Sequence, residues 1–382
     1  MKKICYVTTI SDTLKAFVLD SAKYLHENGN YDITFICDYD QKFADTLPEY
    51  IHYIPVPMKR GISVSGFKTI FRMRRIFKNE KFDLVQYSTP NASFYSAIAA
   101  KSAKIPVRLY CQWGIAYVGY NGIKRNVLKI IEKIICYCST WIEPDSFGNR
   151  RFSIKEGLYK KDKSSVVWHG SANGVNLKKF NINCKNDWAK IIKTKYQIPD
   201  NYFILGFIGR ITRDKGINEL LRATKDLLEI KDNVILLIIG EKESNHNLEL
   251  ALLEWAKNEK RIIFCGWTCE VEKYIAAMDV LILPSHREGF GSVVIEAGAM
   301  GVPSIVTDIP GPTDVVENGE TGIVVKKGDY KDFLRAILKL EDDRKSLEYL
   351  GETMRRRVTE RYNQEELMKY IFIDRETLLN KR

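Results

Sequence analysis

The sequence of 382 residues has no long apolar segment. A membrane-spanning helix requires about 20 consecutive, mostly apolar residues, and the longest candidates here, such as residues 234–239 and 280–284, are far shorter. The first residues include two lysines but lead directly into a strand-like run, without the length or the small-residue exit of a signal peptide. We therefore expect a protein without a transmembrane helix that stays in the cytoplasm.

Metal-binding and disulfide patterns are also missing. The eight cysteines are scattered without the C-x2-C spacing of a zinc site, so we interpret them as reduced, mostly buried apolar residues. No expected strand is followed by G-x-G-x-x-G, which disfavours a nicotinamide-dependent enzyme. With 45% hydrophobic and 28% charged residues, the composition is that of an ordinary globular chain of two or three domains.

Positive charge is concentrated in the first half of the chain. Residues 1–180 contain 28 Lys and Arg against 15 Asp and Glu, whereas the remainder contains 31 against 33. The density is highest over residues 59–78, where seven basic and several apolar residues alternate without an acidic one, which indicates a basic amphipathic helix. Such a helix either lies on an anionic membrane surface or is a solvated face that covers a sheet. Nucleic acid is disfavoured as a partner because no recognised reading module accompanies the charge.

Short β-branched runs alternate with longer helical stretches, which is typical of βαβ units in parallel sheets. We expect strands near residues 4–9, 33–37, 53–56, 84–87, 108–111, 141–143 and 165–168, and again near 204–208, 234–239, 262–265, 280–283, 304–306 and 322–325. A segment rich in small and turn-forming residues, 170–180, separates the two series. We predict two Rossmann-like, doubly wound α/β domains, 1–180 and 181–363, facing across a cleft, with a final helix over 364–382 that packs back on the first domain.

One loop of the second series carries two cations. Residues 209–216 follow a strand and lead into a helix, and they place Arg210 and Lys215 after Gly209. A guanidinium forks onto phosphate oxygens, an ammonium acts as a compact charge, and the helix start adds backbone N–H groups. This loop is a candidate diphosphate site, although two solvated loop cations are the alternative.

A second loop carries two carboxylates. Residues 286–297 follow the strand near 280–283 and contain Glu288 and Glu296, which are separated by seven residues. Between them lie Gly289, Phe290, Gly291 and Ser292, where glycines allow a close backbone approach and a helix begins. Carboxylates are strong acceptors for paired hydroxyls, so Glu288 is a candidate ligand for the hydroxyls of a sugar and Glu296 for those of a ribose. The alternatives are a solvated loop acid and an exposed helix residue.

With these motifs, the sequence resembles the retaining GT-B nucleotide-sugar glycosyltransferases of family 4 over nearly its whole length. The resemblance rests on Gly209 and Arg210 with Lys215 and Gly216, on the pair Glu288 and Glu296, on residues 171–175, and on the glycines from 311 to 322. Residues 168–177 and 131–133 are most similar to bacterial enzymes that build capsule, exopolysaccharide or O-antigen repeat units.

The resemblance implies an acceptor-binding first domain and a donor-binding second domain. It implies that Arg210 and Lys215 hold the donor diphosphate, Glu288 the transferred sugar and Glu296 the ribose. Arg210, Lys215 and Glu288 are then the catalytic residues, because fixed cations stabilise the charge that develops on the leaving diphosphate. The implied reaction retains the anomeric configuration and needs no metal or other cofactor. The donor is expected to be a nucleotide-sugar, with UDP as the first choice, and the acceptor a saccharide on polyprenyl diphosphate, reached peripherally at the inner face of the cell membrane.

The sequence departs from the family pattern on the acceptor side. Many relatives have a glycine pair where this chain has residues 8–13, and a histidine where it has residues 111–114. Gln112 or Trp113 is a candidate replacement for that histidine, and His169 is a further candidate, although Trp113 as a core aromatic and His169 as a structural residue are open alternatives.

Two other functions compete with this interpretation. A metal-dependent transferase would use an Asp-x-Asp pair, and Asp38 and Asp40 have that spacing, but such a fold leaves the four donor residues unexplained. A non-catalytic, membrane-associated scaffold of the same fold is the second. Within the glycosyltransferase interpretation itself, transfer to a soluble or another lipid acceptor is also open. The base, the transferred sugar and the linkage are not specified by any residue.

Overall fold

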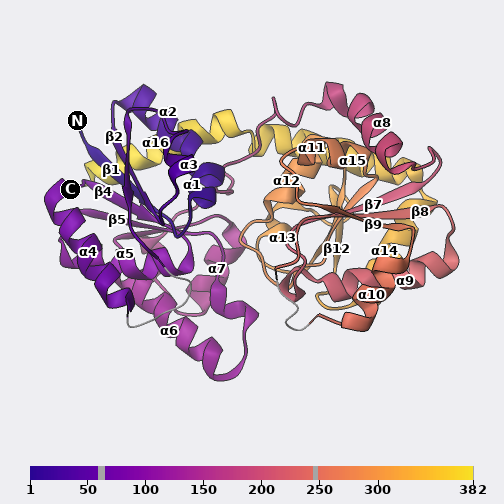
Figure 1. Cartoon of the computed structure of the whole chain (residues 1–382), viewed down its shortest axis with the longest axis horizontal. Helices are drawn as coiled ribbons and strands as arrows, with labels where there is room; N and C mark the ends of the chain where they lie inside the picture. Colours follow the sequence, from indigo (N-terminus) through magenta and orange to yellow (C-terminus); the bar gives the residue numbers. More distant parts are fainter. Residues whose placement is uncertain (59–64, 244–247, 382) are drawn as a thin grey trace. The chain divides into compact units, whose positions relative to one another are not determined.

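The computed structural model describes residues 1–58, 65–243 and 248–381, and the chain divides into two compact units. The first unit consists of Met1–Asn173 and Gln364–Arg382, and the second of Gly174–Asn363 (Figure 1). Each unit contains one six-stranded sheet with helices on both faces, and each is described by itself below.

The sheet of the first unit is entirely parallel, with the strand order β3-β2-β1-β4-β5-β6. The strands are β1 (Lys3–Val7), β2 (Asp32–Cys37), β3 (Ile51–Pro55), β4 (Leu84–Tyr87), β5 (Val107–Gln112) and β6 (Trp141–Pro144). The chain starts in the middle, moves to one edge, and then returns to β4 beside β1. This reversal makes β1 and β4 the point at which open α/β sheets bind ligands beyond the carboxyl ends of their strands.

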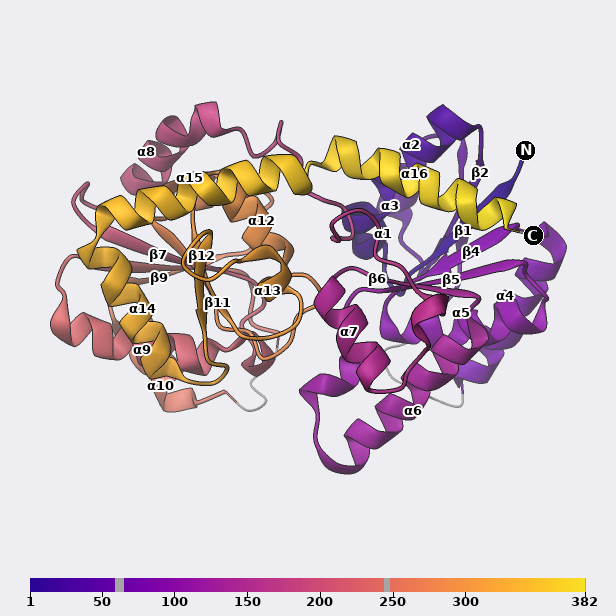
Figure 2. The same ribbon diagram turned by 180° about the vertical axis from the view of Figure 1, so that it is seen from behind.

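Two helical layers cover this sheet. Helices α4 (Ser65–Glu80), α5 (Pro90–Ser102) and α6 (Gly122–Cys138) contribute to one apolar core, and α1 (Ser11–Phe17), α2 (Leu19–Gly29), α3 (Gln41–Ala44) and α16 (Gln364–Asn380) to the other. Helix α7 (Phe147–Lys155) follows β6. In both views the yellow C-terminal helix α16 lies beside the indigo helix α2 and away from α4 to α6 (Figures 1 and 2).

The predicted strand at residues 165–168 is wrong. Beyond β6 the chain makes only an isolated bridge between Ile142 and Ser164, and Trp168 has a φ of 50°. An extended strand cannot continue through this left-handed backbone conformation. The sheet therefore ends at β6.

The sheet of the second unit repeats the same winding. Its order is β12-β11-β10-β7-β8-β9, all parallel, so the reversal now lies between β7 and β10. The strands are β7 (Phe203–Ile208), β8 (Val234–Ile239), β9 (Ile262–Gly266), β10 (Val280–Leu283), β11 (Ser304–Thr307) and β12 (Gly322–Val325). Alternate residues of β8 belong to the two opposite cores, which explains its uninterrupted apolar sequence.

The helices of the second unit form two corresponding layers. Helices α9 (Ile217–Ile230), α10 (Leu250–Asn258) and α14 (Tyr330–Asp342) pack on one face, and α8 (Lys185–Tyr196), α11 (Val271–Ala277), α12 (Ser292–Ala299) and α15 (Arg344–Arg361) on the other. Helix α13 (Pro312–Val315) precedes β12. Asp343 separates α14 from α15 and accepts a hydrogen bond from the backbone N–H of Ser346, which caps the second helix.

The boundary between the units falls at residues 173 and 174 and not near residue 180. The segment that the sequence assigned to the end of the first domain packs on the second unit, because Val175 donates a backbone hydrogen bond to Tyr362 and Phe180 is buried in the same apolar core. Helix α16 belongs to the first unit, where Leu367, Ile371 and Leu378 are buried.

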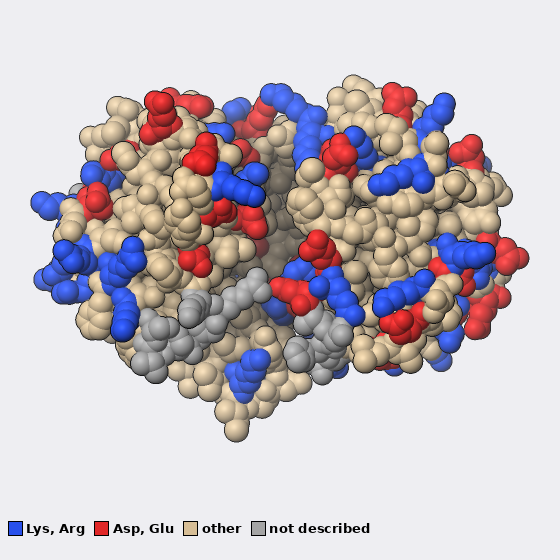
Figure 3. All heavy atoms as spheres, in the orientation of Figure 1, with Lys and Arg blue, Asp and Glu red and all other residues tan. Residues whose placement is uncertain are grey.

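The basic stretch of residues 59–78 forms helix α4 from Ser65 onward, while Lys59 and Arg60 lie outside the described residues. In the space-filling view, Lys and Arg side chains gather over α4 and α5 at the left (Figure 3). Within the described part of the chain, no helix combines the length and the apolar character needed to cross a membrane.

Candidate active site

The two predicted donor loops leave neighbouring strands at the reversal point of the second sheet. Residues 209–216 follow β7, and residues 284–291 follow β10, which pairs with β7. The backbone N–H of His286 donates to the carbonyl of Asp214 at 2.8 Å. A Cβ on Gly216, whose φ is 75°, would lie 2.0 Å from the carbonyl oxygen of Pro284. Only glycine fits this close approach, so the two loops are held together at the carboxyl edge of the sheet.

Lys215 and Glu288 bring the predicted cation and carboxylate into direct contact. The Lys215 ammonium donates to Oε1 of Glu288 at 2.6 Å, and the Ser285 hydroxyl donates to the same oxygen at 2.7 Å. The side chains of Lys215 and Glu288 are 20% and 10% exposed, so the pair is partly desolvated and keeps one accessible side. Its charges therefore act more strongly on a bound ligand than those of a fully solvated pair.

Arg210 lies in the same loop with a half-exposed guanidinium. It pairs with Glu243, and its second nitrogen lies 3.7 Å from the carboxylate of Asp214. These acidic neighbours hold the guanidinium near the loop, where its remaining N–H groups are accessible.

Asp214 organises the cations of both loops, although the sequence analysis did not single it out. Arg287 donates to its carboxylate at 2.8 Å, and the Thr212 hydroxyl donates at 2.6 Å. Burial by itself would raise the pKa of Asp214. The hydrogen bond from Thr212 and the surrounding positive charges outweigh burial, so the pKa is lowered from its ordinary value. Asp214 is thus an ionised anchor that positions the cationic loop, and its place between Arg213 and Lys215 was the available signal.

The glycine-rich segment after Glu288 forms the turn into helix α12. Gly291 has a φ of 86° and precedes the first helical residue, Ser292. A Cβ on Gly311 would lie 2.3 Å from the carbonyl oxygen of Gly289, which shows how tightly the turn is packed. Phe290 is buried, and its ring meets that of Tyr362 edge to face. Phe290 therefore anchors the turn in the core and does not line an open surface.

Glu296 is the fifth residue of α12 and lies in a strongly desolvated position. Burial, with an added contribution from the Glu272 carboxylate, raises its pKa to about 7, against the opposing charge of Lys179. Lys179 itself lies 3.6 Å from Glu272 and donates to the carbonyl of Cys269 at 3.1 Å. Among the described residues, no side chain or backbone group forms a hydrogen bond or ion pair with the Glu296 carboxylate. Its acceptor atoms are thus available to hydroxyl donors.

The acceptor-side candidates of the first unit are in three different environments. Gln112 ends β5 and is fully buried: its amide nitrogen donates to Glu132 at 2.6 Å, and its oxygen accepts from Ser153 and Tyr159. With both ends of the amide engaged in the core, Gln112 has no surface to offer a substrate, and we do not retain it as an acceptor residue. The buried network could not be recognised from sequence because its members come from four separate segments.

Trp113 and His169 are partly exposed. The Trp113 ring packs on Phe17 with centroids 5.4 Å apart, and it lies partly buried against the apolar core of the first unit. His169 follows Trp168, whose ring stacks on Tyr370 of α16. Both remain acceptor-side predictions.

Two family models match the chain. The model of the Glycosyl transferase 4-like family covers residues 3–142, and that of the Glycosyl transferases group 1 covers residues 189–357. The capsular polysaccharide biosynthesis glycosyltransferase CapM of Staphylococcus aureus is 32% identical over 363 residues, which are 95% of this chain and 93% of that protein. The chain belongs to the family 4 glycosyltransferases. The UDP-Gal:alpha-D-GlcNAc-diphosphoundecaprenol alpha-1,3-galactosyltransferase of Escherichia coli is 27% identical, covering 88% and 86% of the two chains.

Solved structures identify the fold of this glycosyltransferase as GT-B. Anabaena Alr3699/HepE in complex with UDP and glucose matches with a TM-score of 0.80 at 17% identity, covering 99% of this chain and 100% of that one. WaaG, a glycosyltransferase involved in lipopolysaccharide biosynthesis, matches with a TM-score of 0.74 at 16% identity, covering 97% and 99%. The predicted α/β fold class is confirmed.

The Asp-x-Asp pair of the first unit has a structural explanation in this glycosyltransferase. Asp40 caps α3 by accepting from the backbone N–H of Phe43, and the hydroxyl of Ser11 also donates to it. These hydrogen bonds, the one from Ser11 first, lower its pKa. Asp38 accepts from the backbone N–H of Tyr39. In the described part of the chain, no three His, Cys, Asp or Glu side chains are grouped as metal ligands.

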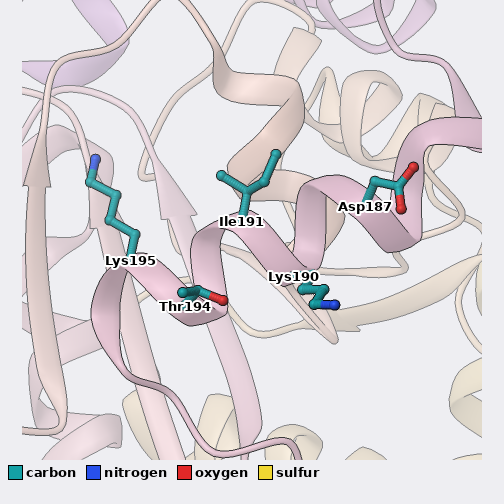
Figure 4. A pocket seen from close by; sticks show the side chains of 5 residues that line it. All are labelled: Asp187, Lys190, Ile191, Thr194 and Lys195. Atoms are coloured by element: carbon teal, nitrogen blue, oxygen red, sulfur yellow. The ribbon is translucent and has the colours of Figure 1, made fainter.

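A hollow of about 570 Å³ on helix α8 lies apart from the donor loops in the second unit. It is lined by Asp187, Lys190, Ile191, Thr194 and Lys195, all from this one helix (Figure 4). None of the predicted site residues lines it. We therefore assign the candidate active site to the carboxyl edge of the sheet, where the charged groups converge.

Proposed function

We propose that this glycosyltransferase moves a hexose or N-acetylhexosamine-type sugar from a nucleotide-sugar to a saccharide on polyprenyl diphosphate, in the synthesis of a surface polysaccharide. The names of two full-length relatives, a capsule enzyme and a galactosyltransferase acting on a diphosphoundecaprenol-linked sugar, support this substrate class. A UDP-sugar is the first donor to test.

One observation carries the proposed donor site: the 2.6 Å contact of Lys215 with Glu288 at the reversal point of the second sheet. We assign the donor diphosphate to Lys215 and Arg210, because both cations come from the loop after β7. We assign the hydroxyls of the transferred sugar to Glu288 and those of the ribose to Glu296. The carboxylate of Glu296 is partly buried and accepts no hydrogen bond from the described residues, which supports the second assignment, since desolvated acceptors require a hydrogen-bonding partner.

The proposed reaction retains the anomeric configuration. The bond between the anomeric carbon and the diphosphate oxygen breaks, and a new bond to the acceptor hydroxyl forms on the same face. The proton of that hydroxyl passes to the departing phosphate oxygen, so no side chain need act as a general base. Lys215 and Arg210 stabilise the negative charge that grows on the diphosphate. We propose that no metal ion is required, since these two cations take that role.

The first unit is proposed to bind the acceptor, with Trp113 and His169 on that side. Its positive charge suits a lipid diphosphate at an anionic bilayer, and we propose peripheral association with the inner face of the cell membrane.

The test is a screen of nucleotide-sugars for thermal stabilisation, followed by mass spectrometry of products formed on short polyprenyl-diphosphate saccharides with EDTA present. We expect one sugar to be added, and the anomeric proton coupling of the product to match that of the donor. A product of inverted configuration would overturn retention, and loss of activity in EDTA would overturn metal independence. Donor binding without transfer to any lipid-linked or soluble saccharide would favour the non-catalytic scaffold.

A further inference from the structure

Helix α6 exposes an unusually apolar outer face. Five large apolar side chains on this helix are exposed, Ile123 by 83%, Val127 by 50%, Ile130 by 58%, Ile134 by 36% and Tyr137 by 73%. At 100° per residue their positions fall within an arc of about 80°. The five residues, called the α6 apolar face below, therefore form one continuous stripe along the helix.

The α6 apolar face is not needed to attach the helix to its sheet. The opposite side of α6 does so, because Ile135 and Cys136 are buried in the core beneath it. A helix that packs through one side ordinarily presents polar residues on the other. A contiguous exposed apolar stripe is instead typical of a surface that binds a partner.

The charges around the α6 apolar face are positive. Lys124 and Lys133 are exposed beside it. Helix α6 contains one acidic residue, Glu132. It is buried, with 6% exposure, and accepts hydrogen bonds from Tyr110 and Gln112. The outer side of α6 thus combines apolar and cationic groups without an exposed carboxylate of its own. This combination of side chains complements a partner that has an anionic outer layer over an apolar interior.

Helix α4 repeats this combination on the same side of the sheet. Phe67 and Phe71 are 65% and 69% exposed, and the exposed basic residues Lys68, Arg72 and Arg75 lie beside them. Helix α5 packs between α4 and α6, and all three cover one face of the sheet (Figures 1 and 2). The two apolar and basic helices therefore flank α5 within a single unit.

We propose that the α6 apolar face, together with Phe67 and Phe71 of α4, inserts into the headgroup region of an anionic lipid bilayer. Amphipathic helices with basic flanks bind such interfaces through buried apolar area and through attraction to acidic lipid. The excess of 28 basic over 15 acidic residues in the first 180 residues favours an anionic bilayer over a second, equally basic copy of the chain. This inference rests on the proposed function, because an enzyme that uses a lipid-linked acceptor must reach that acceptor at a membrane.

The experiment compares Ile130→Glu with Ile373→Glu in co-sedimentation with vesicles of phosphatidylglycerol and phosphatidylcholine. Ile373, on helix α16 of the same unit, is 57% exposed, which matches the 58% of Ile130. We expect the wild-type chain to bind the anionic vesicles and to stay partly bound when salt is raised, since inserted side chains are not screened. Ile130→Glu should weaken vesicle binding roughly tenfold, whereas Ile373→Glu should leave it unchanged. Equal melting temperatures of the two variants verify that both are folded.

Three outcomes would overturn the inference. These are equal vesicle binding by both variants, complete release of the wild-type chain by salt, and a change from dimer to monomer in Ile130→Glu without an effect on vesicles. Transfer to a short, water-soluble acceptor separates the inference from the proposed function. Ile130→Glu should keep that activity and lose transfer to a vesicle-embedded acceptor. Vesicle binding without any transfer would refute the function and leave the membrane surface intact.

Discussion

The two units share one strand order but use charged residues in opposite places. In the second unit none of the six strands contains a charged residue, and the cations and carboxylates follow the strands in loops at the carboxyl edge. In the first unit charged and polar side chains lie within the fold itself, as Gln112 and Glu132 illustrate. The same topology thus supports a charged ligand edge in one unit and internal polar networks in the other.

A second internal network attaches the C-terminal helix to the first sheet. Arg375 of α16 is 2% exposed and donates to both carboxylate oxygens of Glu143 on β6, at 2.9 Å for its Nη2, and to Gln86 of β4 at 3.3 Å. Asp374 also pairs with this guanidinium. A buried charge is tolerated only when it is paired and hydrogen-bonded. The comparison therefore predicts that substitutions in the first unit's network affect stability and those at the second unit's edge affect catalysis.

The largest expected effect is on stability. Arg375→Ala leaves the Glu143 carboxylate buried without its partner, so we expect the free energy of unfolding to fall by about 3–5 kcal/mol. Chemical denaturation measures the change. The exposed Arg75→Ala serves as control and should shift stability by less than about 0.5 kcal/mol. A loss of less than about 1 kcal/mol for Arg375→Ala would contradict the assigned role of the network.

The next effect is on catalysis. Glu288→Gln keeps the size of the side chain but removes the charge that accepts from Lys215, so kcat/KM should drop about 10²–10³-fold. The free energy of unfolding should change by no more than about 1 kcal/mol. Glu254→Gln, at an exposed pair with Lys257, is the matched control and should retain full activity. Unimpaired transfer by Glu288→Gln would remove this residue from the site.

A third effect concerns pH. Since the pKa of Glu296 is raised to about 7, the carboxylate is mostly ionised at pH 8 and mostly protonated at pH 6. If the ionised form binds the ribose, affinity for a nucleotide-sugar should fall about tenfold between pH 8 and pH 6, and Glu296→Gln should abolish that dependence. Calorimetric titration with the intact nucleotide-sugar is the measurement, because the terminal phosphate of a free diphosphate titrates in this range. An identical pH dependence in the variant would exclude Glu296 as its source.

Ionisation of Glu296 should also lower the stability of the folded chain as the pH rises. Folding raises the pKa of Glu296, so protonation of this group stabilises the folded state fully below its ordinary pKa of 4.5, and the contribution is lost as pH rises through about 7. At pH 8, therefore, Glu296→Gln should be more stable than the wild-type chain, and this advantage should vanish at pH 4.

The smallest effect is expected at the Asp-x-Asp pair. Asp40→Ala removes the cap of α3 and should cost about 1 kcal/mol of stability. Transfer activity, assayed with and without EDTA, should remain near that of the wild-type chain. A loss of activity that added Mn²⁺ restores in the wild type but not in Asp40→Ala would instead support the metal-dependent alternative.

The donor loops were predictable because their residues are contiguous and follow strands. Arg210, Lys215 and Glu288 could be named from two short segments, and parallel pairing of β7 with β10 brings such segments together. Gln112 was a candidate only because it stands where relatives have a histidine, whereas the three partners that engage it in the core come from α6, α7 and the segment after α7. Arg375 was not noticed, since a helical arginine is exposed in most proteins.

The sequence alone determined the two wound units, through apolar runs that must be buried on both faces, and it located the charged loops through their glycines. It could not determine which polar residues are internal. Only the tertiary structure decided which charged groups are solvated and which are buried, because groups far away in the chain surround them. Arg375 pairs with Glu143, and Glu296 is desolvated near Glu272. The pKa of a carboxyl and the stability of a buried ion pair follow from that surrounding medium, which no local pattern encodes.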